Sequence, residues 1–229
     1  KYPIETYLVN SLGTHQLLQY MLEKNPDVRF VYASSSEAYG EPQEHPQKET
    51  YWGNVNPNGV RSCYDESKRF GEMVCGVHSR DMSIDIRIMR IFNTFGPRMN
   101  PADGRVIPNF VTQALHNNPL TVYGDGSQTR SFCYVDDLIA GMILLAESPK
   151  ASGMTINLGN PEEKTMLELA MRIKEQTDSK SEIVYQPLPG DDPTKRRPDI
   201  SKAKEVLGWA PKVTFEVGLQ KTIEYFKGK

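Results

Sequence analysis

The sequence predicts an α/β fold built around a parallel sheet, because strand-like and helix-like runs alternate along the chain. The segments 28–33 and 84–91 are rich in valine, isoleucine and aromatic residues and are predicted to be strands. The segment 64–81 between them has apolar residues at helical spacing. Parallel strands require such a crossover, and ligands collect at the carboxyl ends of the strands. Polar groups that follow the two strands are therefore candidates for a site.

The other elements follow from apolar spacing and from residues that start or stop helices. An amphipathic helix is predicted near the N-terminus, where apolar residues recur between Tyr7 and Leu22. Thr165 followed by Glu168 has the form of a capping box. Prolines make 40–61 a loop. Further predicted elements are helices at 106–117, 134–147, 165–177 and 201–207, a strand at 120–123, a turn at 124–127 and a specialised loop at 186–199.

The composition argues against several classes of protein. A net charge of −2 gives no electrostatic sign of a nucleic-acid partner. No apolar run approaches the roughly 18 residues of a membrane helix. The scattered cysteines Cys63, Cys75 and Cys133 are expected to be free thiols in a reducing compartment, so we expect a cytoplasmic protein, although a preceding segment could anchor it in a secretory compartment. The histidines have no ligand spacing, and no metal site is expected.

Tyr64 and Lys68 are the most informative pair in the chain. Their Tyr-x-x-x-Lys spacing places them one turn apart on one face of a helix. A lysine ammonium at that distance favours the phenolate, so the tyrosine can exchange a proton near neutral pH. The pair alone is common by chance. Ser35, Ser36 and Glu37 after the first strand add hydroxyls and a carboxylate, and together the five residues indicate acid–base chemistry on an alcohol or ketone.

Five segments of the sequence carry a family resemblance. They are SSSEAYGEPQEHPQKETYWGNVNPNGVRSCYDESKR at 34–69, RIFNTFGPRMNPADGRVIPNF at 90–110, LTVYGDGSQTRSFCYVDDL at 120–138, NLGNPEE at 157–163 and DDPTKRRPDISKA at 191–203. As a set they are highly specific, and they cover nearly the whole chain. The chain resembles the extended short-chain dehydrogenase/reductases that act on nucleotide sugars, and within them the UDP-glucuronate decarboxylases.

The resemblance implies a Rossmann-type parallel sheet that binds NAD, N-terminally incomplete here, with a smaller C-terminal substrate domain. We expect 1–96 together with 133–160 to form the NAD-binding part, and 97–132 with 161–229 to bind the nucleotide sugar. The family's glycine-rich strand–turn–helix, which cradles the NAD pyrophosphate, has no counterpart in the sequence. We therefore expect the chain to correspond to about the C-terminal two-thirds of such an enzyme, and in isolation it could lack NAD binding.

The resemblance also implies chemical roles. Tyr64 would remove the 4-hydroxyl proton of UDP-glucuronate while a hydride passes to NAD. Lys68 would lower the pKa of Tyr64, and Ser35 would complete the group. The resulting 4-keto acid would lose carbon dioxide, be reprotonated at C5 and be reduced at C4, which gives UDP-xylose and regenerates NAD.

Ser36, Glu37 and Arg196 point to decarboxylation among the related reactions. The 4,6-dehydratases of the family carry Asp-Glu at 36–37 and the 4-epimerases usually small residues, whereas Ser-Glu fits decarboxylation with Glu37 assisting proton delivery. Alternatively, Glu37 only braces a loop. Arg196 matches an arginine placed to meet the sugar carboxylate, which a guanidinium binds through both oxygens. Alternatively, 195–197 is a solvated basic turn, and the sequence leaves open which of its three side chains points inward.

The remaining assignments rest on resemblance alone, and each residue could instead satisfy backbone groups. The implied substrate-binding residues are Asn93, Tyr123, Gln128, Arg130 and Asp192. The implied cofactor-binding residues are Asn10, Thr94 and Arg105, besides Tyr64 and Lys68.

Three functions and one assembly follow. The first candidate function is the decarboxylase, and the second is a UDP-hexose 4-epimerase or another nucleotide-sugar enzyme. The third is a non-catalytic fragment that binds a nucleotide sugar, and the absence of the glycine loop motivates it. The family also implies a homodimer through the helix that carries Tyr64. Phe70, Met73, Val74 and Val77 have the spacing for such a contact, but core burial explains them equally well.

Overall fold

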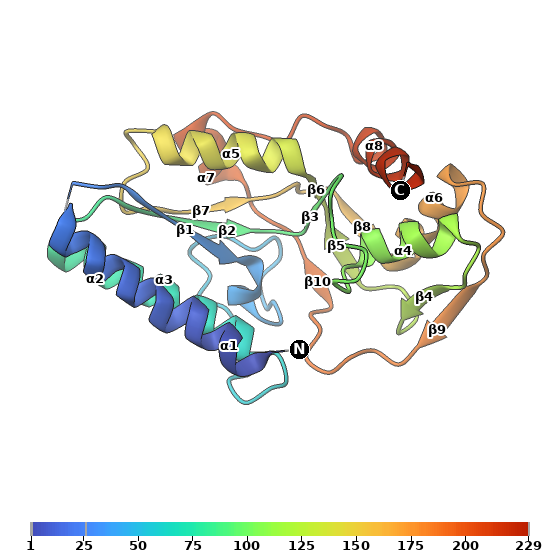
Figure 1. Ribbon diagram of the computed structural model, residues 1–229, viewed down its shortest axis with the longest axis horizontal. Coiled ribbons are helices and arrows are strands. Elements are labelled where there is room, and N and C mark those ends of the chain that lie inside the picture. The colour runs from blue at the N-terminus through green and yellow to red at the C-terminus, as the bar shows by residue number, and fades with distance from the viewer. Residues whose placement is uncertain (1, 26, 229) are drawn as a thin grey trace.

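A three-stranded parallel sheet forms the centre of one half of the molecule (Figure 1). The computed structural model describes residues 2–25 and 27–228. The strands lie in the order β1 (Phe30–Ser35), β2 (Ile86–Ile91) and β7 (Thr155–Leu158). Phe30 is in register with Ile86, and Ile88 with Thr155. The predicted α/β fold with a parallel sheet is confirmed.

Helices cover both faces of this sheet (Figure 1). On one face, α1 (Pro3–Tyr7), a π-helical segment (Leu8–Gly13) and α2 (Thr14–Lys24) run on without a break and lie beside α3 (Ser62–Met82). On the other face lie α5 (Val135–Glu147) and α7 (Ser201–Leu207). Leu18, Val74 and Ile86 share one hydrophobic cluster, and Leu145, Ile156 and Trp209 share another. In the part of the chain that is described, no helix is long and apolar enough to cross a membrane.

The other half of the molecule is built around a further hydrophobic cluster, which is centred on aromatic rings. Phe95, Phe132 and Phe215 contact one another there, with ring centroids 5.4–6.4 Å apart. The elements of this half are helices α4 (Val106–Leu115), α6 (Met166–Gln176) and α8 (Phe215–Lys227), the strand pair β4 (Leu120–Tyr123) and β9 (Ile183–Gln186), the pair β3 (Thr94–Phe95) and β6 (Cys133–Tyr134), and a sheet of β10 (Lys195–Arg196), β5 (Thr129–Ser131) and β8 (Glu163–Thr165).

Most predicted elements are present, but several were missed, namely helix α8 and the short strands β3, β5, β6, β7, β8, β9 and β10. The strand 120–123, the helix 201–207 and the capping box of Thr165 with Glu168 are observed as predicted. Strands β7 and β9 are only four residues long, too short for a clear period. Helix α8 contains Gly218, which weakens a helix prediction. A Cβ at Gly218 would lie 2.8 Å from Tyr134, so close packing of the helix on that ring requires the glycine.

The loop 40–61 is fastened to the segment after β10 by backbone and amide hydrogen bonds. Gln47 exchanges backbone hydrogen bonds with Arg197 and Asp199, and its side-chain oxygen accepts from the Arg197 amide at 2.8 Å. The buried amide of Asn157 donates to the carbonyls of Gln47 and Asp199 and accepts from the Tyr39 hydroxyl. These hydrogen bonds tie the loop to β7 and to the segment after β10, and the bond to Tyr39 ties the end of the short 3₁₀ turn Ser36–Tyr39 to the same group.

Candidate active site

A cavity of about 620 Å³ opens at the carboxyl ends of β1 and β2. Its walls come from the end of β1 and the turn after it, the first turns of α3, the segment after β2 and the start of α4. Eight of the residues singled out in the sequence line it together: Ser35, Ser36, Glu37, Tyr64, Lys68, Asn93, Thr94 and Arg105. The fold thus brings into one space groups that lie up to about seventy positions apart in the sequence.

Tyr64 and Lys68 lie on the cavity wall formed by α3. The Lys68 ammonium donates a hydrogen bond of 2.9 Å to the Ala33 carbonyl and lies 5.8 Å from the centre of the Tyr64 ring. It also lies 5.4 Å from the centre of the Tyr32 ring. Burial lowers the pKa of Lys68. The lysine is therefore anchored at the end of β1, and its charge lies beside the tyrosine that it is expected to tune.

Ser35 ends β1 and starts the 3₁₀ turn that presents Glu37. Its hydroxyl accepts a hydrogen bond from the Glu37 amide at 3.2 Å, which is the capping contact expected of a serine before a helical turn. Ser36 follows it and is buried in the same wall. The local sequence Ser-Ser-Glu therefore turns the chain sharply and directs a carboxylate toward the cavity.

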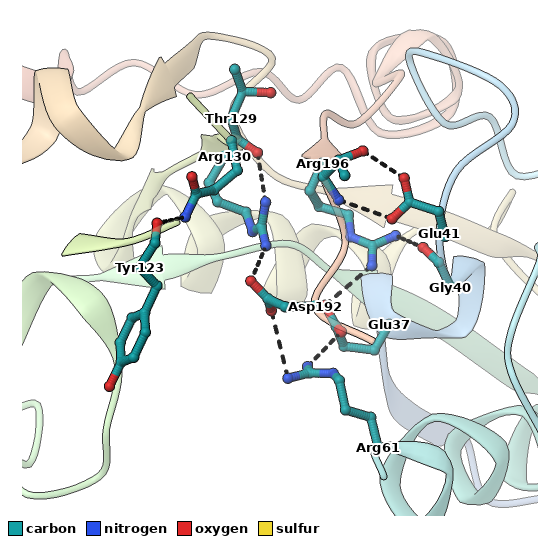
Figure 2. A network of polar contacts seen from close by, with 11 residues as sticks. Glu37, Gly40, Glu41, Arg61, Tyr123, Thr129, Arg130, Asp192 and Arg196 are labelled. Carbon is teal, nitrogen blue, oxygen red and sulfur yellow. Dashed lines mark hydrogen bonds and ion pairs between the residues drawn. The ribbon is translucent and has the colours of Figure 1, made fainter. Parts of the chain in front are cut away.

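Glu37 is held between two arginines (Figure 2). Arg61, which directly precedes α3, donates to one carboxylate oxygen at 2.7 Å, and Arg196 of β10 contacts the other at 3.4 Å. Burial alone would raise the pKa of Glu37, but the charges of Arg196 and Arg61 outweigh it and hold that pKa below its usual value. Glu37 is therefore an ionised hydrogen-bond acceptor, fixed in position.

The same network extends to the residues assigned to substrate binding (Figure 2). Arg130 donates to Asp192 at 2.9 Å, and Arg61 lies 3.7 Å from the other oxygen of Asp192. Arg196 is fully buried and donates to the Gly40 carbonyl at 2.9 Å. Figure 2 shows the three guanidinium groups and two carboxylates in one continuous chain of contacts. Of the three basic residues at 195–197, Arg196 is the one that points inward, whereas Arg197 is half-exposed and pairs with Glu163.

Several assigned residues lie outside the cavity wall. The Asn10 amide donates to Ser67 on α3, and the Gln128 amide donates to the Tyr123 carbonyl. Asp192 lines a second cavity of about 290 Å³, together with residues of the loop 40–61. Arg196 does not line the main cavity itself, and it is connected to that cavity through its contact with Glu37.

Arg61 and Asp65 are the site residues that the sequence analysis missed. Arg61 lines both cavities and contacts both Glu37 and Asp192. The available signal was its spacing: it stands three residues before Tyr64 and therefore one helical turn away on the same side of α3. Asp65 was hidden by its place inside the Tyr-x-x-x-Lys motif, where it faces the second cavity.

Comparison with known proteins agrees with this geometry. Residues 1–222 match the family model described as GDP-mannose 4,6 dehydratase. UDP-glucuronic acid decarboxylase 1 of Arabidopsis thaliana is 51% identical over 99% of this chain and 51% of its own length. The protein of the same description from Danio rerio is 52% identical over 98% of this chain and 53% of its own. The chain thus spans about half the length of these curated relatives.

Solved structures show the same fold. An epimerase from Methanothermobacter thermautotrophicus superposes with a TM-score of 0.92 at 33% identity, covering 99% of this chain and 67% of its own. UDP-glucuronic acid 4-epimerase from Bacillus cereus, in complex with UDP-glucuronic acid and NAD, has a TM-score of 0.88 at 30% identity, covering 96% of this chain and 68% of its own. With its Tyr-x-x-x-Lys pair at the end of a parallel sheet, the chain belongs to the GDP-mannose 4,6-dehydratase family of nucleotide-sugar enzymes.

Proposed function

We propose that the protein to which this chain belongs converts UDP-glucuronate to UDP-xylose by NAD-dependent decarboxylation. One observation carries the proposal: an ionised Glu37, preceded by Ser36 rather than an acid, shares the cavity with Tyr64 and Lys68. An elimination would require an acid beside the departing hydroxyl, and Ser36 cannot supply one. The names of the curated relatives support the same reaction.

The residues present fit one end of NAD, the cofactor carried by the Bacillus cereus epimerase. The Lys68 ammonium spends one donor on Ala33, so two of its three donors remain for the hydroxyls of a ribose. Thr94 and the end of β1 supply polar groups on the neighbouring wall. Residues 2–25 and 27–228 contain no glycine-rich strand–turn–helix for the pyrophosphate. The fit therefore concerns the nicotinamide and its ribose.

Tyr64 begins the reaction as the base for the sugar 4-hydroxyl. NAD, when bound, would accept the hydride from C4 of the sugar and later return it to the same carbon. The Lys68 ammonium stabilises the phenolate of Tyr64 while the proton is transferred. The product of this step is a 4-ketone β to the C5 carboxylate.

The carboxylate of that keto acid leaves as carbon dioxide, and the electrons of its C–C bond pass to an enolate at C4. Tyr64, now protonated, donates a hydrogen bond to the enolate oxygen. Glu37, fixed by Arg61 and Arg196, accepts a hydrogen bond from the water or hydroxyl that delivers a proton to C5. The ketone is then reduced, and Tyr64 returns its proton to the 4-oxygen.

Incubation of the full-length protein with NAD and UDP-glucuronate labelled at the carboxyl carbon tests the proposal. We expect labelled carbon dioxide and UDP-xylose in equal amounts, and a loss of both with Tyr64→Phe. Recovery of UDP-galacturonate without carbon dioxide would instead identify the 4-epimerase, which the Bacillus cereus neighbour keeps as the second candidate. A non-catalytic fragment predicts neither product, and calorimetric titration of residues 1–229 with NAD measures whether this segment binds the cofactor.

We also propose that the protein forms a homodimer through α1, the π-helical segment and α3. These helices lie side by side, and Val9, Leu12, Phe70 and Met73 are large apolar residues exposed on them. Val74, in contrast, is buried in the core cluster. Sedimentation of the full-length protein should give a dimer, and Met73→Glu should shift it toward the monomer.

The buried Cys75 and Cys133 are free thiols, which supports a cytoplasmic location.

A further inference from the structure

Asp65 is a buried carboxylate with an unsatisfied oxygen. It lies beside the arginine network, which is the chain of contacts formed by Arg61, Arg130 and Arg196 with Glu37 and Asp192. It follows Tyr64 in the first turn of α3, but it lines the second cavity, together with Arg61, Asp191 and Asp192. Its side chain is 6% exposed, and its Oδ1 has no hydrogen-bond partner among the described residues. Burial raises the pKa of Asp65 to about 7, with a further contribution from the charge of Glu37, while Arg61 and Arg196 oppose the rise. This carboxyl therefore titrates closer to neutral pH than an ordinary aspartate does.

The protonation of Asp65 decides the charge of the whole network. Three guanidinium groups, those of Arg61, Arg130 and Arg196, lie among the carboxyls of Glu37, Asp192 and Asp65, and Glu41 and Asp191 also line the second cavity. When Asp65 is ionised, the carboxylates outnumber the guanidinium groups. Protonation of Asp65 removes one negative charge, so an entering anion meets less repulsion.

Asp65 is the carboxyl in this network best placed to take up a proton. Both oxygens of Glu37 face guanidinium groups, and so do both oxygens of Asp192. Protonation of either would break an ion pair. Protonation of Asp65 breaks no hydrogen bond at Oδ1 and relieves the repulsion from Glu37. The charged groups that face Asp65 are Glu37 on the 3₁₀ turn, Arg61 before α3, Arg196 on β10, Glu66 on α3, and Glu41, Asp191 and Asp192 around the cavity.

We propose that Asp65 is a positioning residue that binds a proton when an anionic group of the substrate enters the arginine network. The proposal rests on the proposed function, because it takes UDP-glucuronate as the anion. Linkage makes the effect reciprocal: an anion that favours protonated Asp65 binds more tightly when the proton is already present. Substrate binding should therefore take up about one proton above pH 7 and should weaken as the pH rises.

The alternative is that Asp65 serves α3 alone. An ionised acid in the first turn of a helix interacts favourably with the helix dipole. In that role Asp65 would stay ionised, and substrate binding would not depend on its proton. The two roles give opposite results in a measurement of affinity against pH.

The test uses the full-length protein with NAD, and Tyr64→Phe as the background that prevents turnover. Calorimetry of UDP-glucuronate binding between pH 6 and pH 9 should show the Kd rising by up to tenfold per pH unit above about 7. In Asp65→Asn, which keeps the shape of the side chain without its charge, the Kd should stay flat near its low-pH value. Glu205→Gln, an exposed carboxylate on α7 that is not among the groups facing Asp65, should keep the slope. An unchanged slope in Asp65→Asn overturns the proposal.

A second measurement separates this proposal from the proposed function. Infrared difference spectra of substrate-free full-length protein, wild type minus Asp65→Asn, should show a protonated carboxyl band at pH 6 that disappears by pH 9. Circular dichroism checks that the variant is folded. If the band is absent at pH 6, the Asp65 proposal fails even when carbon dioxide is released. If the band titrates as expected and grows when UDP is added, the Asp65 proposal stands even when no carbon dioxide is found.

Discussion

The guanidinium of Arg87 donates a hydrogen bond of 2.6 Å to the backbone carbonyl of Leu145 and thereby joins the central strand β2 to the last turn of α5. Arg87 is almost completely buried, and it also donates to the Ala146 carbonyl and to Asp85. The last carbonyls of a helix have no partner within the helix, so they need donors from elsewhere. Arg87 supplies them from the sheet below α5.

Replacing this arginine should destabilise the protein strongly. We expect Arg87→Met to lower the free energy of unfolding by about 3 kcal/mol, because it removes the buried guanidinium from its ion pair with the partly exposed Asp85 and leaves helix carbonyls unsatisfied. Chemical denaturation measures the change. Arg29→Met is the matched control: Arg29 also contacts Asp85 and the Ala146 carbonyl, but it is more exposed, so its loss should cost less than about 1 kcal/mol. Equal losses in the two variants would contradict this account.

Asp85 should make the stability fall at acid pH. Burial opposes ionisation, but hydrogen bonds with Arg87, Arg29 and Ser152 together outweigh it and lower the pKa of Asp85 to about 2 in the folded state. A carboxyl whose pKa is lowered in the folded state stabilises the fold at pH values above its ordinary pKa. That contribution disappears as the pH falls toward 2. Asp85→Asn should therefore be less stable than wild type at pH 6 and nearly equal to it below pH 2. Thermal unfolding at a series of pH values checks the convergence.

Asp65 should change the stability of the fold with pH in the opposite direction to Asp85. Its pKa is raised to about 7, so its contribution to stability is fully present below about pH 4 and disappears as the pH rises through 7. Asp65→Asn should therefore unfold at a higher temperature than wild type at pH 8 and show little difference near pH 4. A variant that is less stable at both pH values would assign Asp65 to the helix dipole instead.

Glu37→Gln should separate decarboxylation from oxidation. The amide still accepts a hydrogen bond but carries no charge, and it leaves Arg196 without its ionised partner. We expect the rate of carbon dioxide release to fall by roughly 10²-fold or more. The rate at which NADH forms through oxidation of the sugar C4 should fall much less. Absorbance at 340 nm and release of labelled carbon dioxide measure the two steps in the full-length protein. Glu41→Gln is the control, because Glu41 contacts Thr194 outside the main cavity. Equal losses in both steps would contradict this role for Glu37.

The sequence was sufficient for elements with strong local signals. Helix α3 has a long apolar stripe, and Thr165 and Glu168 form the capping box that their spacing indicates. Placing Ser35 and Asn93 in one cavity required only that the parallel strands β1 and β2 end at the same edge of the sheet.

Orientation of the basic residues required the fold. The direction of Arg196 is set by pairing of its two-residue strand with β5, where it lies opposite Arg130, and nothing within 195–197 determines this pairing. The spacing of Arg61 to Tyr64 indicates which side of α3 it lies on, but its partners Glu37 and Asp192 come from distant segments that only the fold brings to it. Asp65 is buried only because distant segments close the second cavity around it.

The hydrogen bonds between the loop 40–61 and the segment 197–199 have a practical consequence for engineering. Gln47, Asn157 and Asp199 come from three distant parts of the chain, and each amide or carbonyl is matched to the others. A graft that imports only one of these segments from a related enzyme would separate partners that fit each other. Exchange of reaction specificity within this family should therefore succeed when the turn with Glu37, the loop and the Arg196 segment are transplanted as a single module, with an asparagine kept at position 157.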